Sequence, residues 1–117
     1  MMVNEEYRGL VYPWGRKSPV NFGEPMEVAP GVWWVRFKMP GGLDHINIWL
    51  LEEEGGWTVV DTCMKLDSAK AQWEQLFTDF MQGKPVLRVI CTHFRPDHIG
   101  LAGCLCERFD CEVWMTR

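Results

Sequence analysis

The sequence lacks the long apolar segments of a membrane or exported protein. No apolar run approaches the roughly 18 residues needed to cross a bilayer. The first ten residues include Glu5 and Glu6, where a signal peptide has a basic stretch followed by an apolar one. We therefore expect a cytoplasmic protein with no membrane partner.

Positive charge is also scarce, and it is scattered. The 117 residues contain 12 Lys and Arg against 16 Asp and Glu, which gives a formal net charge of -4. Proteins that bind nucleic acid usually concentrate basic residues in a patch or stripe, and none is visible here. The sequence therefore predicts a small-molecule substrate and no nucleic-acid partner.

The chain has five cysteines, an odd number that argues against a framework of disulfides. Without an export signal we expect them to be reduced. A zinc site made by thiolates is an alternative, because three of the five lie close together in the sequence. Residues two apart on a helix project about 200° apart, however, so Cys104 and Cys106 would not face the same ion. Small buried hydrophobes are the favoured interpretation of Cys63, Cys91, Cys104, Cys106 and Cys111.

Hydrophobic patterning divides the chain into an arm and one domain. Residues 1–25 mix proline and glycine without any hydrophobic period, which predicts an irregular N-terminal arm. Residues 26–117 are regular and include most of the seven Trp and six Phe that can build a core.

Within 26–117 the pattern alternates between strands and helices. Alternating or continuous apolar runs predict strands at 32–37, 45–51, 57–61, 86–91 and 112–115. Apolar residues at three-and-four spacing predict a helix that begins with Asp67 or Ser68 as its cap and stops before Pro85, and a second helix at 99–109. An antiparallel meander followed by strand, helix, strand, helix, strand predicts an α/β protein whose mixed sheet carries its helices on one face.

The segment most informative about chemistry is residues 92–100, between a predicted buried strand and a helix. Side chains at the carboxyl end of such a strand face the crevice where ligands bind. His93, Asp97 and His98 place two imidazoles and a carboxylate within six residues, and zinc accepts these ligands in catalytic sites. The alternative is that Asp97 only caps the helix and the histidines lie in an ordinary loop.

This segment, THFRPDHIG, resembles the Thr-His-x-His-x-Asp-His-x-Gly signature of the metallo-β-lactamase fold hydrolases. The resemblance extends to DHINIWLLEEEGGWTVVDTC, which is similar to the family's opening hairpin and Asp-Thr-Gly turn, and to GLAGCLCERFDCEVWMTR, which is similar to its next helix and strand. It covers roughly 26–117. Within the family, the broad group of glyoxalase-II-like hydrolases of the bacterial cytosol is the most similar.

The resemblance implies an αββα sandwich that holds two zinc ions in its complete form. It implies that His93 binds the first metal and that Asp97 and His98 bind the second, with Asp97 also orienting the attacking water. Asp61 would support the metal loop through hydrogen bonds, although a buried Asp can also serve only as a turn former. The implied activity is zinc-dependent hydrolysis of an ester, thioester or lactone-type small molecule.

Two substitutions depart from the family pattern. Arg95 stands where the signature has its second histidine, and a guanidinium stays protonated and cannot coordinate a metal. Arg95 would then weaken the first metal site, or it would bind an anionic carboxylate or phosphate of a substrate. Cys63 stands where the family usually has glycine, so a positive φ there would strain the loop.

His45 is the one histidine outside the signature. The resemblance implies a residue at the rim of the active site that could contact substrate. The favoured alternative is a structural histidine held by a hydrogen bond.

The family's domain is considerably longer than this chain, and its remaining metal ligands follow the segment matched here. We therefore expect the amino-terminal half of the fold, as a fragment or a naturally short form, with one zinc ion or none and impaired hydrolysis. The alternative function is a non-catalytic half-fold that serves in binding or association. A homodimer that completes the fold is the partner we expect.

Overall fold

The computed structural model describes residues 5–7, 10–12, 21–39 and 45–115. Its main feature is one mixed sheet of six strands in the order β3-β4-β5-β6-β7-β8. Strands β3 to β6 form an antiparallel meander, and β6, β7 and β8 are parallel neighbours. The strands are β3 (Met26–Ala29), β4 (Val32–Lys38), β5 (His45–Glu53), β6 (Gly56–Val60), β7 (Val86–Cys91) and β8 (Glu112–Met115).

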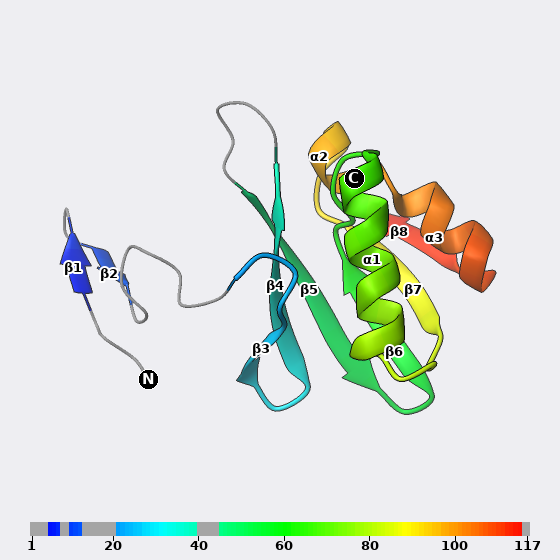
Figure 1. Cartoon of the computed structure of the whole chain (residues 1–117), viewed down its shortest axis with the longest axis horizontal. Helices are drawn as coiled ribbons and strands as arrows, with labels where there is room; N and C mark the ends of the chain where they lie inside the picture. The colour runs from blue at the N-terminus through cyan, green and yellow to red at the C-terminus, as the bar shows by residue number, and fades with distance from the viewer. Residues whose placement is uncertain (1–4, 8–9, 13–20, 40–44, 116–117) are drawn as a thin grey trace.

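Helices connect the parallel strands. Helix α1 (Asp67–Asp79) joins β6 to β7, and the short α2 (Pro96–Ile99) and α3 (Ala102–Phe109) join β7 to β8. Figure 1 shows α1 and α3 packed on the same side of the sheet. The predicted α/β fold, a mixed sheet with helices on one face, is confirmed. No helix in the described ranges is long and apolar enough to span a membrane.

The structure differs from the sequence-based expectation near the N-terminus. A separate antiparallel pair, β1 (Glu5–Tyr7) and β2 (Leu10–Tyr12), lies within the segment expected to be irregular. Strand β3 was not predicted either. These strands have three or four residues, which is too short for a hydrophobic period to become visible.

The core lies between the sheet and α1. In β5, buried Ile46, Ile48 and Leu50 alternate with more exposed residues, as expected when one face of a strand is covered. Trp73 of α1 is 2% exposed, and its ring centroid lies 5.1 Å from that of Phe37 in β4. This aromatic contact fixes α1 over the centre of the sheet.

The opposite face of the sheet also carries aromatic side chains. Trp34 of β4 and Trp49 of β5 are stacked with centroids 6.4 Å apart, and both are half-buried. Trp114 of β8 is 53% exposed and lies 5.6 Å from the guanidinium carbon of Arg88 in β7. These aromatic side chains share the face opposite α1 and α3 with polar residues, among them Arg88, which forms an ion pair with Glu53.

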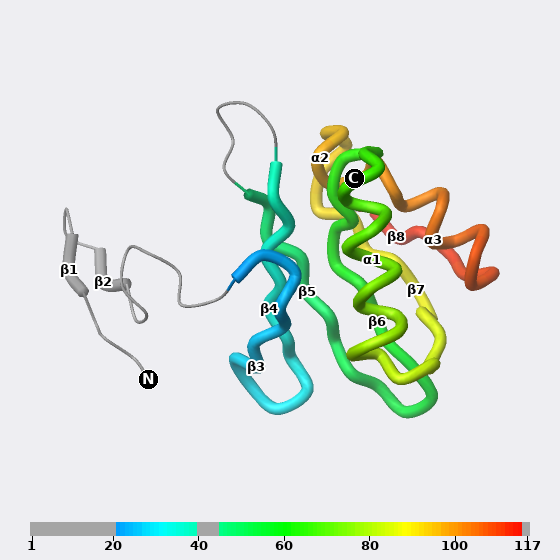
Figure 2. Tube along the Cα trace, viewed as in Figure 1, coloured from blue at the N-terminus to red at the C-terminus, as the bar shows by residue number. Residues whose placement is uncertain are grey.

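The parallel pairing of β6 and β7 brings two loops to one edge of the sheet. Val60 pairs with Ile90 near the carboxyl ends of the two strands. The loop after β6, residues 61–66, and the segment after β7, residues 92–101, which includes α2, therefore lie side by side, as the chain path in Figure 2 shows. This edge holds most of the predicted site residues.

The predicted cap of α1 is wrong in detail. Leu66 precedes the helix with an extended backbone and no side-chain cap, and Asp67 is already the first helical residue. The Asp67 carboxylate in the first turn still interacts favourably with the positive end of the helix dipole.

Candidate functional site

Asp61 joins the two loops at the edge of the sheet. Its side chain is 6% exposed, and its backbone N–H donates to Ile90 O at 2.7 Å. The Asp61 Oδ1 accepts the Thr92 backbone N–H at 2.8 Å, while Oδ2 accepts the Thr92 hydroxyl at 2.7 Å and lies 2.9 Å from His98 Nδ1. A carboxylate with these partners both anchors the loop after β7 and orients an imidazole.

This network determines which ring nitrogens of the two histidines are available. An ionised carboxylate only accepts hydrogen bonds, so the Thr92 hydroxyl and His98 Nδ1–H must donate to Asp61. The Thr92 oxygen then accepts from His93 Nδ1, which is 2.9 Å away. Both histidines in this neutral form carry their proton on Nδ1 and leave the Nε2 lone pair for a ligand, the arrangement seen in metal-binding histidines.

Asp97 lies next to His98. Its Oδ2 is 3.5 Å from His98 Nε2, and the side chain is 14% exposed. Asp97 does not cap the helix as one alternative held, because α2 has Arg95 at its N-cap and no side-chain cap bond. The ring centroids of His93 and His98 are 4.8 Å apart. The three predicted ligands are therefore neighbours, with His98 in the middle.

Arg95 lies at the same place but faces solvent. Its side chain is 67% exposed, and Nε is 3.7 Å from Asp97 Oδ1. A cation bound by Asp97 would meet the charge of this guanidinium at short range, which disfavours metal binding. The same exposed guanidinium can approach an anionic group from solvent.

The donor set fits one side of a zinc site. Imidazole and carboxylate are suitable zinc ligands, and Asp61 holds His98 in the required tautomer. Among the described residues, however, no group of three or more His, Cys, Asp or Glu side chains is arranged so that it could hold an ion. A complete metal centre would need donors from outside this part of the chain.

Thr62 is a structural residue of the site that the sequence analysis did not single out. Its side chain is fully buried. The Thr62 hydroxyl donates to His98 O at 2.8 Å and accepts the Leu101 N–H at 3.0 Å, and its backbone N–H also donates to His98 O. Trp73 Nε1 of α1 donates to Thr62 O at 2.9 Å. Thr62 thus fixes the main chain of residues 92–101, named the ligand loop here after its predicted metal ligands, against the core.

The backbone around Thr62 is strained. Asp61 has φ 64° and Cys63 has φ 78°, a region that costs non-glycine residues about 1–3 kcal/mol each. The positive φ considered for Cys63 is therefore present. Gly100 permits the loops to meet, because a Cβ there would lie 2.6 Å from Pro96 O and 2.7 Å from Lys65 N.

His45 lies at the start of β5, at the same edge of the sheet. Its Nδ1 is 3.5 Å from Arg36 Nη2 in β4. This contact connects His45 with the neighbouring strand, and a role at the rim of the site stays a prediction.

The five cysteines are all free. Burial raises the pKa of the Cys63 thiol, and burial together with the nearby Asp61 carboxylate raises the pKa of Cys91 to about 11. These two are inert, buried thiols at neutral pH.

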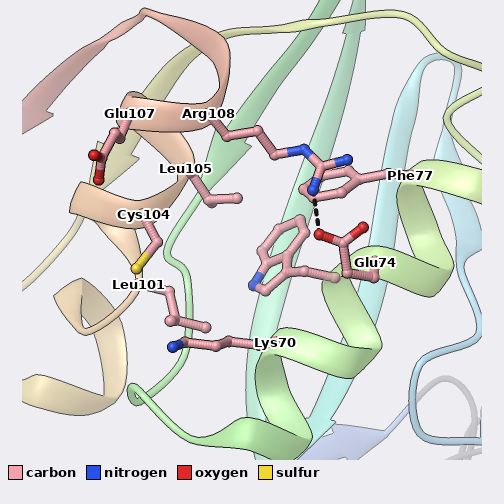
Figure 3. A pocket seen from close by; sticks show the side chains of 9 residues that line it. Lys70, Glu74, Phe77, Leu101, Cys104, Leu105, Glu107 and Arg108 are labelled. Atoms are coloured by element: carbon pink, nitrogen blue, oxygen red, sulfur yellow. Dashed lines mark hydrogen bonds and ion pairs between the residues drawn. The ribbon is translucent and has the colours of Figure 1, made fainter.

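A cavity of about 420 Å³ lies between α1 and α3, away from the loop edge. Figure 3 shows Arg108 of α3 reaching across it to Glu74 of α1, with which it forms an ion pair. The described lining contains none of the predicted site residues. It consists of Lys70, Trp73, Glu74, Phe77, Leu101, Cys104, Leu105, Glu107 and Arg108.

The fold and the ligand loop together define a class of protein. A family model described as the metallo-beta-lactamase superfamily matches residues 41–117. The chain belongs to this superfamily, and it corresponds to an N-terminal portion of the fold.

Relatives of known name and structure are much longer than this chain. A beta-lactamase domain protein from Burkholderia ambifaria is 46% identical and superimposes with a TM-score of 0.78, over 90% of this chain and 33% of that one. An (R)-specific secondary-alkylsulfatase from a Pseudomonas species is 28% identical over 83% of this chain, and a linear primary-alkylsulfatase is 31% identical over 74%. The chain spans 14% and 12% of the length of these two enzymes.

Proposed function

We propose that this chain forms the N-terminal part of a zinc-dependent hydrolase that acts on a small molecule. One observation carries the proposal: Asp61 holds His98 by Nδ1, so that Nε2 faces Asp97 Oδ2 at 3.5 Å. With its proton on Nδ1, His98 presents the Nε2 lone pair beside the Asp97 carboxylate, so that a cation could contact both residues.

His98 and Asp97 would hold the ion together with donors from outside the described part of the chain, and His93 would have to move to join them as a further ligand. A zinc ion bound there would lower the pKa of a coordinated water to about 7 and polarise the bond to be cleaved. Asp97 would accept a hydrogen bond from the attacking water and orient it. Asp61 would stabilise the tautomer of His98, and Thr62 would keep the ligand loop at a fixed distance from the core.

We propose an ester-type bond as the target. The family resemblance favours an ester, thioester or lactone, and the two Pseudomonas relatives, named as alkylsulfatases, add sulfate esters to this class. Arg95 supports an anionic substrate, because its side chain is 67% exposed and its guanidinium lies beside Asp97. His45, at the same edge of the sheet, is a second residue proposed to contact substrate.

The experiment that tests this function is a hydrolysis assay with zinc supplied. The substrates are p-nitrophenyl acetate, an acyl thioester, a lactone and a long-chain alkyl sulfate. We expect zinc-dependent turnover of at least one, lost in Asp97→Asn and retained in Asp79→Asn, an exposed carboxylate at the end of α1. Turnover that is insensitive to Asp97→Asn would contradict the proposal.

The second candidate function is a non-catalytic module that binds or associates. The observation in its favour is the ion pair of Arg95 with Asp97, because Asp97 is a proposed metal ligand and the ion pair would compete with metal binding. This candidate predicts no zinc binding and no turnover of any of the four substrates.

We also propose a homodimer and a cytoplasmic location. The aromatic side chains Trp34, Trp49 and Trp114 on the sheet face opposite the helices support association of two copies. Five free cysteines suit a reducing compartment.

A further inference from the structure

Two cysteines meet at the carboxyl end of α3. The Cys106 Sγ and Cys111 Sγ atoms are 3.6 Å apart, and the Cys111 thiol donates a hydrogen bond to Cys106. Both side chains are half-buried. The sequence analysis placed Cys104 and Cys106 on opposite sides of the helix, and the structure agrees: Cys104 lines the cavity between α1 and α3, whereas Cys106 contacts Cys111.

The geometry of the helix end creates this contact. Asp110 has the left-handed conformation, with φ 52° and ψ 54°, and its N–H donates to Cys106 O. Cys111 N–H donates to the same oxygen at 3.2 Å. This bond from the second residue beyond a helix to a residue in its last turn is typical of a Schellman motif, which brings those two side chains together. In this chain, both of them are thiols.

We propose that Cys106 and Cys111 form a reversible disulfide that closes the turn between α3 and β8. The sulfur atoms must approach from 3.6 Å to the bond length of about 2.05 Å. Small rotations of both side chains can supply this movement, because neither residue is fully buried. The backbone bonds of Asp110 and Cys111 to Cys106 O already hold the two residues close together.

The oxidant we assign is a low-molecular-mass organic disulfide such as glutathione disulfide. The thiolate of one cysteine attacks one sulfur of the glutathione disulfide and releases the first glutathione. The second cysteine, as its thiolate, then attacks the mixed disulfide and releases the other glutathione. Two protein thiols are oxidised, one glutathione disulfide is reduced to two glutathione molecules, and the thiol protons pass to water and from there to the released thiolates.

The surroundings of Cys106 slow the oxidation of the pair at neutral pH. Burial, the hydrogen bond with Cys111 and the nearby Cys91 raise the pKa of Cys106 to about 12. Its thiolate is therefore rare at neutral pH, and disulfide exchange should be slow at pH 7 and faster at pH 9.

The test uses the whole chain, treated with glutathione disulfide at pH 8.5, alkylated and analysed by intact mass and peptide mapping. We expect loss of two hydrogen atoms, a peptide linked through Cys106 and Cys111, and a Tm raised by several degrees that dithiothreitol reverses. Cys104→Ser should behave as the unchanged protein, whereas Cys106→Ser and Cys111→Ser should not lose the hydrogens.

Two results would overturn the proposal: a stable glutathione adduct without an internal bond, or a linkage that uses Cys91 or Cys104 instead. Peptide mapping of the unchanged protein distinguishes these results even if a serine variant fails to fold.

Discussion

At the scale of single residues, Asp61 and Thr62 connect the two loops of the site in complementary ways. Asp61 binds the side chains of Thr92 and His98, whereas Thr62 binds the main chain at His98 and Leu101. One residue therefore sets the orientation of the imidazole, and the next sets the position of its backbone. Both depend on the strained turn at Asp61 and Cys63.

Replacing Thr62 with Val tests the second of these roles. The change keeps the shape of the side chain but leaves the buried Leu101 N–H without the Thr62 hydroxyl as its acceptor. We expect the free energy of unfolding to fall by about 1–3 kcal/mol, measured by urea denaturation. Thr78→Val, at an exposed position of α1, is the matched control and should change it by less than about 0.5 kcal/mol. Equal effects of the two substitutions would contradict the role of Thr62.

The buried thiol of Cys91 predicts a loss of stability at alkaline pH. Its pKa is raised to about 11 in the folded protein, from an ordinary value of 9.0. The protonated thiol therefore contributes stability that is complete below about pH 9 and declines as the pH rises toward 11.

Thermal unfolding between pH 8 and pH 10.5 measures this effect. Cys91→Ala should show a shallower fall in Tm with pH than the unchanged protein, whereas Cys104→Ala should keep the original slope. The account of Cys91 fails if its alanine variant loses stability as steeply as the unchanged protein does.

The sequence predicted part of this residue-level network. A supporting role for Asp61 followed from the resemblance, and the structure places its carboxylate against His98 and Thr92. Thr62 was not identified, because its hydroxyl connects to the loop after β7 through backbone groups of His98 and Leu101, which are more than 35 positions away. Every residue type carries the same backbone groups, so the sequence does not reveal which of them a distant side chain binds.

At the scale of elements, close contact between the loop after β6 and α2 decides the shape of the site. Gly100 has an ordinary helical φ of -51°, so its role comes from space and not from backbone freedom. A Cβ at this position would lie within 3 Å of backbone atoms of Pro96, Cys63 and Lys65.

Gly100→Ala and Gly103→Ala form a matched pair that tests this contact. We expect Gly100→Ala to destabilise the protein by about 1–3 kcal/mol, because the loops must separate. Gly103 lies in α3 with no atom within 4 Å of its virtual Cβ, so Gly103→Ala should stabilise the helix by about 0.5–1 kcal/mol. Chemical denaturation of both variants measures the change in the free energy of unfolding. If both substitutions change it in the same direction, the loops do not meet as described.

Long helices and strands were predicted from the sequence, whereas most of the short ones were not. The nine residues of β5 and the thirteen of α1 show clear periods and were predicted. The predicted helix 99–109 contains α3, but the four-residue α2 was missed, because Pro96, Asp97 and His98 were expected in the loop. The break after α2 coincides with a tertiary contact, in which Leu101 N–H donates to the Thr62 hydroxyl. Such a contact has no local sequence signal.

At the scale of the whole molecule, the sheet face opposite the helices bears on association. The stacked Trp34 and Trp49 and the exposed Trp114 lie away from the helices. We expect this face to bury itself in a homodimer, and sedimentation at micromolar concentration to show two copies.

Trp49→Arg should convert the dimer to a monomer, because a charge would be buried in the interface. Phe94→Arg is the control, since Phe94 is 73% exposed on the ligand loop at another surface. If the unchanged protein is a monomer at this concentration, the proposed homodimer is wrong.

The central claim is that the loop after β7 binds metal through His98, and native mass spectrometry with zinc supplied tests it most directly. We expect bound zinc in the unchanged protein, more in Arg95→His because a cation is replaced by a ligand, and none in His98→Ala. Absence of zinc from both the unchanged protein and Arg95→His would contradict the claim and leave the chain as a non-catalytic member of its superfamily.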